Sequence, residues 1–240
     1  MQTVTRVRPL LRVATVLLAA SLAVTACGGQ DSSTSADTST PAPSTSATSS
    51  PSSSPSTQAG GSSHGADPTT GGRLVRVDKY AISYRVPQDW ISVDGKALLR
   101  PDSPVLAQVA KRLGLTVDQL ITAIGNNIQA YSVSDKGAVG GVLDTVNLIG
   151  VPTSGITGDQ IRLQLAGIGA KPGKSVSART PVGEVARVPY VWDTQGHRIY
   201  GVSMAVDLGT ATAQITVSAH DARSAGSIAD LVQGSLQKLS

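Results

Sequence analysis

The chain has 240 residues, one cysteine, no phenylalanine and a formal net charge of +4. A single cysteine excludes an internal disulfide framework. Residues 1–26 carry three of the 20 basic residues and none of the 16 acidic ones, so the remaining chain has a net charge of only +1. Because its charges are also scattered singly, this composition argues against a nucleic-acid partner.

The first 27 residues have the pattern of an export signal. Three arginines precede a short apolar run from Val13 to Ala23, which is too short to span a bilayer. Val24–Ala26 and then Cys27 follow, and this segment resembles the lipobox of bacterial lipoproteins. The resemblance implies a signal peptide over 1–26, removed by cleavage, and a Cys27 sulfur that carries diacylglycerol with fatty acids such as palmitate. The alternative for Cys27 is a free or buried thiol.

A polar segment follows the cysteine. Residues 28–72 contain 14 Ser, 8 Thr, 7 Gly and 5 Pro and no large apolar side chain, so we expect residues 27–72 to form a disordered tether. As a flexible coil it would span roughly 35–40 Å on average. Such Ser/Thr/Pro segments are also candidates for O-glycosylation. His64 lies alone within the tether and is interpreted as solvated rather than as a metal ligand.

Residues 73–240 are predicted to form one domain, which opens with a strand and two helices. Residues 80–86 alternate apolar and polar side chains, which is typical of a strand, and Pro87 ends it. Ser103 followed by proline predicts a helix start, and Gly114 predicts its end. Thr116–Gln119 matches a capping box that opens a second helix. The apolar face expected on the first helix consists of Val105, Leu106, Val109, Ala110 and Leu113.

The rest of the domain is predicted as strands, a helix, a meander and a closing helix. Strands are expected at 131–133 and 142–151, and a third capped helix begins at Thr157. Four alternating segments at 176–178, 186–192, 200–206 and 211–219 predict an antiparallel meander, in which Pro189 indicates an edge or a bulge. Asp221 is expected to cap the final helix. The apolar stripe expected on that helix consists of Ile228, Leu231, Val232, Leu236 and Leu239.

This element order predicts an α+β fold, with an antiparallel sheet of about five to seven strands and a C-terminal meander covered by helices. The opening Tyr80-x-Ile82-x-Tyr84-x-Val86-Pro87-x-x-Trp90, the helix-then-meander order and the amphipathic last helix resemble the PsbP-like proteins and the mycobacterial lipoproteins of the LpqN type. The Ala-, Val- and Arg-rich composition is similarly like that of actinobacterial proteins. The resemblance implies a non-catalytic adaptor or envelope protein and supplies no active-site motif.

Searches for catalytic patterns give weak matches. Gly169–Ser175 is similar to a phosphate-binding loop, but Ile168 stands at the first glycine position and the segment leaves a helix. His197 and His220 lack a Gly-x-Ser-x-Gly partner and zinc-ligand spacing. The domain has twelve Asp and only Glu184 as a second kind of carboxylate, and most of these residues are explained as turns and caps. We therefore expect no cofactor, no metal and no enzymatic activity.

Three aromatic residues, Trp90, Tyr190 and Trp192, are the candidate binding surface, with burial in the sheet core as the alternative. The predicted function is that of an extracytoplasmic protein, anchored to the cell membrane by lipid. Its domain would bind an envelope protein, a cell-wall glycan or a lipid without catalysis. One alternative is a carrier that holds a lipid or other apolar ligand in a cavity between sheet and helices. The other alternative is an envelope hydrolase.

Overall fold

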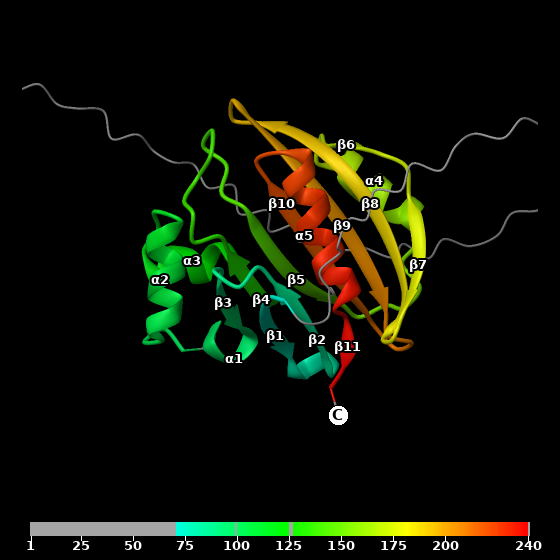
Figure 1. Ribbon diagram of the computed structural model, residues 1–240, viewed down its shortest axis with the longest axis horizontal. Coiled ribbons are helices and arrows are strands. Elements are labelled where there is room, and N and C mark those ends of the chain that lie inside the picture. Colours follow the sequence, from blue (N-terminus) through cyan, green and yellow to red (C-terminus); the bar gives the residue numbers. More distant parts are fainter. Residues whose placement is uncertain (1–70, 99, 125–126, 240) are drawn as a thin grey trace, which may run out of the picture. The chain divides into compact units, whose positions relative to one another are not determined.

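The computed structural model describes residues 71–98, 100–124 and 127–239 (Figure 1). The predicted signal peptide, the lipidation site at Cys27 and the tether up to residue 70 lie outside the described residues. Within the described ranges, no helix combines the length and the apolar character that crossing a membrane requires.

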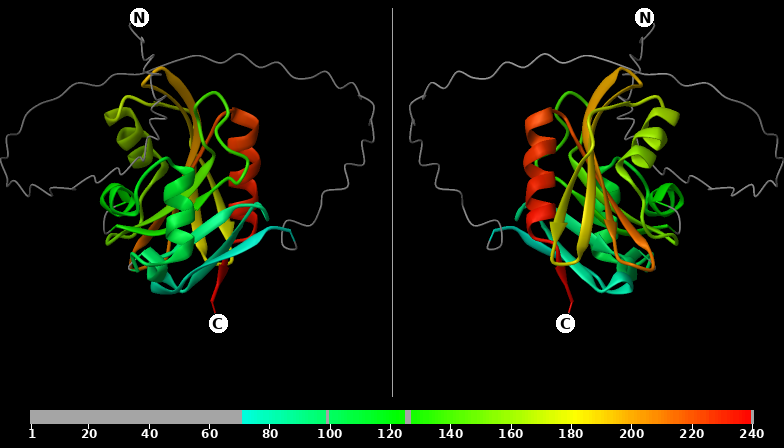
Figure 2. Two further views of the ribbon diagram at one scale, coloured as in Figure 1. Left: turned by 90° about the vertical axis from the view of Figure 1, so that its left-hand side faces the viewer. Right: turned by 90° about the vertical axis from the view of Figure 1, so that its right-hand side faces the viewer.

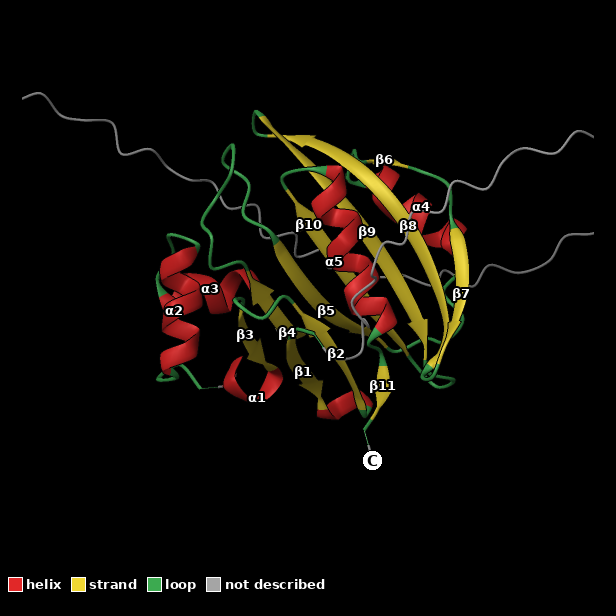
Figure 3. Cartoon of the chain, viewed as in Figure 1, coloured by secondary structure: helices red, strands yellow, loops and turns green. Residues whose placement is uncertain are grey.

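The described residues form two antiparallel sheets (Figure 3). The large sheet has eight strands in the order β3-β4-β5-β10-β9-β8-β6, and β7 pairs with β8 on the same side as β6. Its strands are β3 (Ile91–Asp94), β4 (Ile128–Val133), β5 (Thr145–Val151), β6 (Lys171–Pro172), β7 (Val176–Thr180), β8 (Gly183–Thr194), β9 (His197–Asp207) and β10 (Thr212–Ala219). The small sheet consists of β1 (Arg73–Val77), β2 (Ile82–Val86) and β11 (Gln237–Lys238).

Helices cover both faces of the large sheet. They are η1 (Asp78–Tyr80), α1 (Gly95–Leu98), α2 (Pro104–Arg112), α3 (Val117–Ile124), α4 (Gly158–Gly167) and α5 (Ala222–Gly234). Figure 2 shows α5 on one side of the sheet, and α3 and α4 on the other. Three apolar clusters follow from this arrangement: one joins α5 and the small sheet to the large sheet, one lies under α2 and α3, and one lies under α4. The predicted α+β class with a C-terminal meander is confirmed.

The predicted helix starts are confirmed by their hydrogen bonds. Gln160 N donates to Thr157 Oγ1 at 3.3 Å, and Thr157 N donates to Gln160 Oε1 at 2.8 Å, which completes a capping box. The same pair of bonds joins Thr116 and Gln119 before α3. Asp221 caps α5 by accepting from two backbone amides. Ser103 stands at the start of α2 but forms no capping bond with its side chain.

Several predicted boundaries differ from the structure. The large sheet has eight strands instead of the five to seven expected, because β3 and β6 are too short to show period-two alternation. The strands β1 and β11 of the small sheet, which are short or mostly polar, were not predicted from the sequence either. The last helix ends at Gly234 instead of continuing to Leu239. Ser235 Oγ donates to Leu231 O at 2.6 Å and accepts from Arg85 N at 2.8 Å, which ties the helix end to β2. Val105, expected on the buried face of α2, is 37% exposed.

The first predicted strand also begins later than expected. Tyr80 lies in η1, and Ala81 has a φ of 49°, so the chain reverses there and β2 begins at Ile82. In the meander, Pro189 faces the interruption between β6 and β7, where its missing N–H costs no ladder bond. Gly173 N donates to its carbonyl at 2.7 Å. The edge or bulge predicted at Pro189 is therefore a gap in the neighbouring strand, between β6 and β7.

Candidate functional site

The candidate site is a line of polar side chains on the large sheet, and it originates in the alternation of β10. Ala213, Ile215 and Val217 enter the core beneath α5. Because successive side chains of a strand point to opposite faces, Gln214, Thr216 and Ser218 lie on the other face, on the side of α3 and α4. This pattern was visible in the sequence, but its meaning depends on what the neighbouring strands place beside it.

The strand register extends this line across three strands. Thr216 is paired with Asn147 of β5 and Ser203 of β9, and Ser218 is paired with Thr145 of β5. We call the resulting set the polar stripe. It consists of Thr145, Asn147, Ser203, Gln214, Thr216 and Ser218.

The polar stripe lies between two apolar clusters on the same sheet face. On the β4 side, Tyr131 and Val133 belong to the cluster under α2 and α3. On the β8 side, Val188 and Tyr190 belong to the cluster under α4. The three cross-strand rows that contain the stripe carry no charged side chain.

Side-chain hydrogen bonds occupy the borders of the polar stripe. Gln214 Nε2 donates to Gln164 Oε1 of α4 at 3.3 Å and to Ser203 Oγ at 3.2 Å. The Tyr190 hydroxyl lies 3.2 Å from Ser218 Oγ, and the Tyr131 hydroxyl hydrogen-bonds to Thr145. Burial raises the pKa of both tyrosines, so each remains a neutral hydroxyl at ordinary pH.

The centre of the polar stripe differs from its borders. Asn147 is only 8% exposed, and Thr216 beside it is half-buried. Neither side chain forms a hydrogen bond with another residue of the described ranges. An asparagine amide can donate two hydrogen bonds and accept two, so the stripe presents an amide and a hydroxyl whose bonding capacity is left for water or a ligand.

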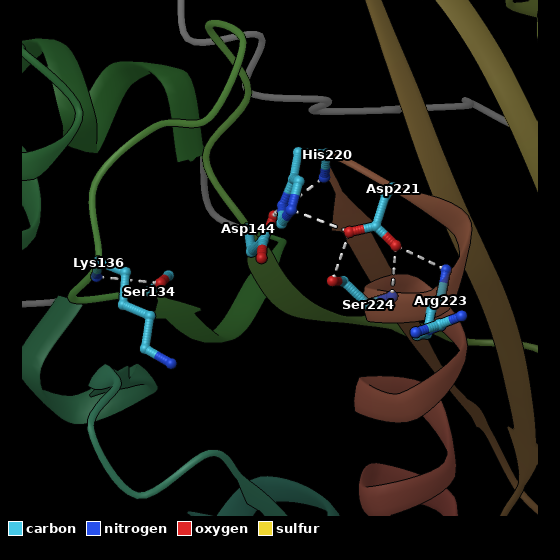
Figure 4. A network of polar contacts seen from close by, with 7 residues as sticks. All are labelled: Ser134, Lys136, Asp144, His220, Asp221, Arg223 and Ser224. Carbon is cyan, nitrogen blue, oxygen red and sulfur yellow. Dashed lines mark hydrogen bonds and ion pairs between the residues drawn. The ribbon is translucent and has the colours of Figure 1, made fainter.

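A second polar cluster surrounds His220 at the end of β10 (Figure 4). His220 Nδ1 lies 2.9 Å from Asp144 Oδ1, and Nε2 lies 2.8 Å from Asp221 Oδ2. Ser224 Oγ donates to Asp221 Oδ2 at 2.7 Å rather than to the histidine, and this bond is the main cause that lowers the pKa of Asp221. With both ring nitrogens against carboxylates, His220 has no free nitrogen to activate Ser224 as a nucleophile.

The other histidine of the domain also has a structural contact. His197 Nδ1 lies 2.9 Å from Gly140 O, in the same segment between β4 and β5 that His220 holds through Asp144. Within the described residues, no group of three His, Cys, Asp or Glu side chains is placed to hold a metal ion.

Two surface pockets are also present, and Ala186 and Ala205, in the same cross-strand row as Gln214, line the second of them. One holds about 200 Å³, and three of its charged residues pair with one another: Lys96 Nζ lies 2.6 Å from Asp78, and Arg76 lies 4.0 Å from the same carboxylate. The other holds about 230 Å³ at the start of α4, with Glu184 and Asp207 in its lining. Both are smaller than a typical small-molecule site of about 300–1,000 Å³, and their charged linings do not suit an apolar ligand.

The three predicted aromatic residues are not gathered at one place. Trp90 is 3% exposed and belongs to the cluster of α5 and the small sheet. Tyr190 and Trp192 lie together under α4 on the other sheet face. Trp192 is half-buried and donates from Nε1 to Ile168 O at 3.1 Å. Trp90 and Tyr190 are buried, as expected from the alternative of a position in the sheet core, and the polar stripe was not predicted from the sequence.

No protein-family model matches the sequence, and no curated protein matches it. Solved structures that are similar to this chain include two bacterial proteins. The solution structure of cyanobacterial PsbP (CyanoP) from Synechocystis sp. PCC 6803 has 10% identity and a TM-score of 0.45, over 69% of this chain and 91% of that one. The crystal structure of LpqN, involved in cell envelope biogenesis of Mycobacterium tuberculosis, has 14% identity and a TM-score of 0.41, over 74% of this chain and 88% of that one. At these values the similarity transfers no functional residue.

Proposed function

We propose that this protein is a lipoprotein of the cell envelope, which displays residues 73–240 as a non-catalytic binding domain outside the cytoplasmic membrane. The observation that carries the proposal is the order of the first 27 residues: three arginines, a short apolar run, three residues Val24–Ala26 and then the single cysteine of the chain, Cys27. A signal peptide alone does not require a cysteine at that point.

Lipid on Cys27 gives a physical basis for stable attachment. Each buried CH₂ group contributes roughly 0.8 kcal/mol, and one acyl chain anchors only reversibly, whereas the two chains of a diacylglycerol anchor stably. Residues 28–72 would then act as a polar tether between the membrane and the domain.

The non-catalytic role is supported by the polar groups of the domain. His220 is held between two carboxylates and His197 contacts a backbone carbonyl, so both serve as structural contacts. The polar stripe, with Tyr190 and Trp192 at its border, is the surface on which binding would take place. Trp90 is buried in the opposite cluster and is not part of that surface. Partners of this surface would be envelope components.

The anchoring is tested with the variant Cys27→Ala, expressed in the native host, with Ser32→Ala in the tether as the matched control. Wild type and Ser32→Ala should enter the detergent phase of a Triton X-114 extraction as chains cut before residue 27. Cys27→Ala should instead retain residues 1–26 or leave the membrane as a soluble chain. A Cys27→Ala chain that is cut before residue 27 and still enters the detergent phase contradicts the proposal.

A further inference from the structure

We infer that the polar stripe binds a neutral, hydroxyl-rich glycan strand. This inference rests on the proposed binding function of the domain and names the class of ligand for its surface. It follows from the unpartnered side chain of Asn147, from the chemistry of the surrounding side chains and from the pairing of β5, β10 and β9, the strands that carry the stripe.

Asn147 is the central observation. The residue is 8% exposed, lies on the sheet face opposite the core beneath α5, and its side chain forms no hydrogen bond with another described residue. An amide in such a nearly buried position, without a protein partner, is expected to bond to water or to a ligand. Thr216, paired with Asn147 across the two strands, adds a half-buried hydroxyl that also forms no hydrogen bond with another described residue.

The side chains around Asn147 favour an uncharged ligand that both donates and accepts hydrogen bonds. Asn147 offers an amide and Thr216 a hydroxyl, and each of these groups can donate and accept, whereas Gln214, Ser203 and Ser218 already bond to neighbouring side chains. No arginine or lysine is present in its rows to bind an anion, and no carboxylate is present to bind a cation. An apolar chain would leave these polar groups unsatisfied.

The strand pairing argues against a peptide added as a further strand. Each of β5, β10 and β9, which carry the stripe, is hydrogen-bonded to a neighbour on both sides. Their backbone groups are therefore used within the sheet, and recognition must come from side chains alone. A glycan is a ligand of this kind, because its hydroxyl groups bind side chains without needing a free strand edge.

The dimensions and the border also fit an extended sugar chain. From Gln214 to Ser218 the stripe runs about 13 Å along β10, and its three strands span about 10 Å. On the α4 side, Tyr190 supplies a neutral hydroxyl bonded to Ser218, and the half-buried ring of Trp192 lies in the same cluster. An aromatic ring at such a border can pack against the C–H face of a sugar.

The test uses the mature lipidated chain, residues 27–240, in detergent and isothermal titration calorimetry with neutral oligomers of N-acetylglucosamine, galactose and arabinose. Two variants, Asn147→Leu and Thr216→Val, replace the free polar groups with side chains of similar size. Thr210→Val, in the exposed turn between β9 and β10, is the matched control for Thr216→Val. Wild type and Thr210→Val should bind at least one oligomer with equal affinity. Each stripe variant should bind it at least tenfold more weakly, with no loss of thermal stability.

Two results would overturn the inference. One is a wild-type chain that binds none of the oligomers, or that binds only phospholipid vesicles or a charged peptide. The other is a stripe variant that folds and binds its oligomer as tightly as Thr210→Val does. If Asn147→Leu fails to fold, Thr216→Val decides. A chain that is lipidated and membrane-anchored but binds no oligomer refutes the glycan inference alone, whereas loss of anchoring refutes the proposed function.

Discussion

The Tyr84 hydroxyl is a buried polar group whose removal is expected to stabilise the domain. Tyr84 is 0% exposed, in the cluster that joins β2 to α5, and its hydroxyl has no hydrogen-bond partner among the described residues. In the unfolded chain the same hydroxyl bonds to water, so folding costs about 1–3 kcal/mol for that atom. Tyr84→Phe keeps the ring and removes the cost. We expect it to raise the free energy of unfolding by about 1 kcal/mol, or roughly 2–4 °C in Tm.

Tyr190→Phe is the matched control, since Tyr190 is also buried but its hydroxyl is bonded to Ser218. Loss of that bond should lower the free energy of unfolding by about 0.5–1.5 kcal/mol. Urea unfolding of the full chain, followed by the fluorescence of Trp90 in the same cluster as Tyr84, measures both variants. If Tyr84→Phe destabilises the domain as much as Tyr190→Phe does, the Tyr84 hydroxyl has a partner and the reasoning is refuted.

Three further predictions concern packing, capping and pH. Gly201→Ala should lower the free energy of unfolding by about 1–3 kcal/mol, because the added Cβ would clash with the Tyr190 ring. Gly226→Ala, whose Cβ would meet open space within α5, should raise the free energy of unfolding by about 0.5–1 kcal/mol. Equal effects of the two variants in urea unfolding would contradict this. Thr157→Ala should cost about 1 kcal/mol and speed amide exchange in the first turn of α4, and unchanged exchange there would count against the capping box. Burial raises the pKa of Tyr84 above its ordinary 10.0, so the wild-type free energy of unfolding should fall as the pH rises above 10, where the unfolded chain loses the tyrosine proton first. The free energy of unfolding of Tyr84→Phe should fall less steeply with pH above 10, and an equally steep fall in both proteins would contradict this.

Local signals predicted much of the fold. The capping boxes at Thr157 and Thr116 and the alternation in the meander depend on neighbouring residues, and the structure confirms them. Long-range contacts decided the features that were missed. Leu236 and Leu239 continue a helical spacing, but the chain leaves the helix after Gly234 because β11 pairs with β2.

The site was harder to predict than the fold for a similar reason. The polar face of β10 can be read directly from its sequence, but a polar strand face is also the ordinary solvated side of an antiparallel sheet. Only the register with β5 and β9 places Asn147 and Ser203 beside Thr216. The polar stripe lies between two apolar clusters only because α3 and α4 pack on the same side of the sheet (Figure 2). Trp90 was grouped with Tyr190 because both are aromatic, but the two side chains lie in clusters on opposite faces of the large sheet.

The intact mass of the mature protein, purified from membranes of its native host, tests lipid anchoring most directly. The expected mass is that of residues 27–240 plus a thioether-linked diacylglycerol, with or without a further acyl chain on the new amino terminus. A mature chain that still begins with residues 1–26, or one in which Cys27 carries no lipid, would contradict it.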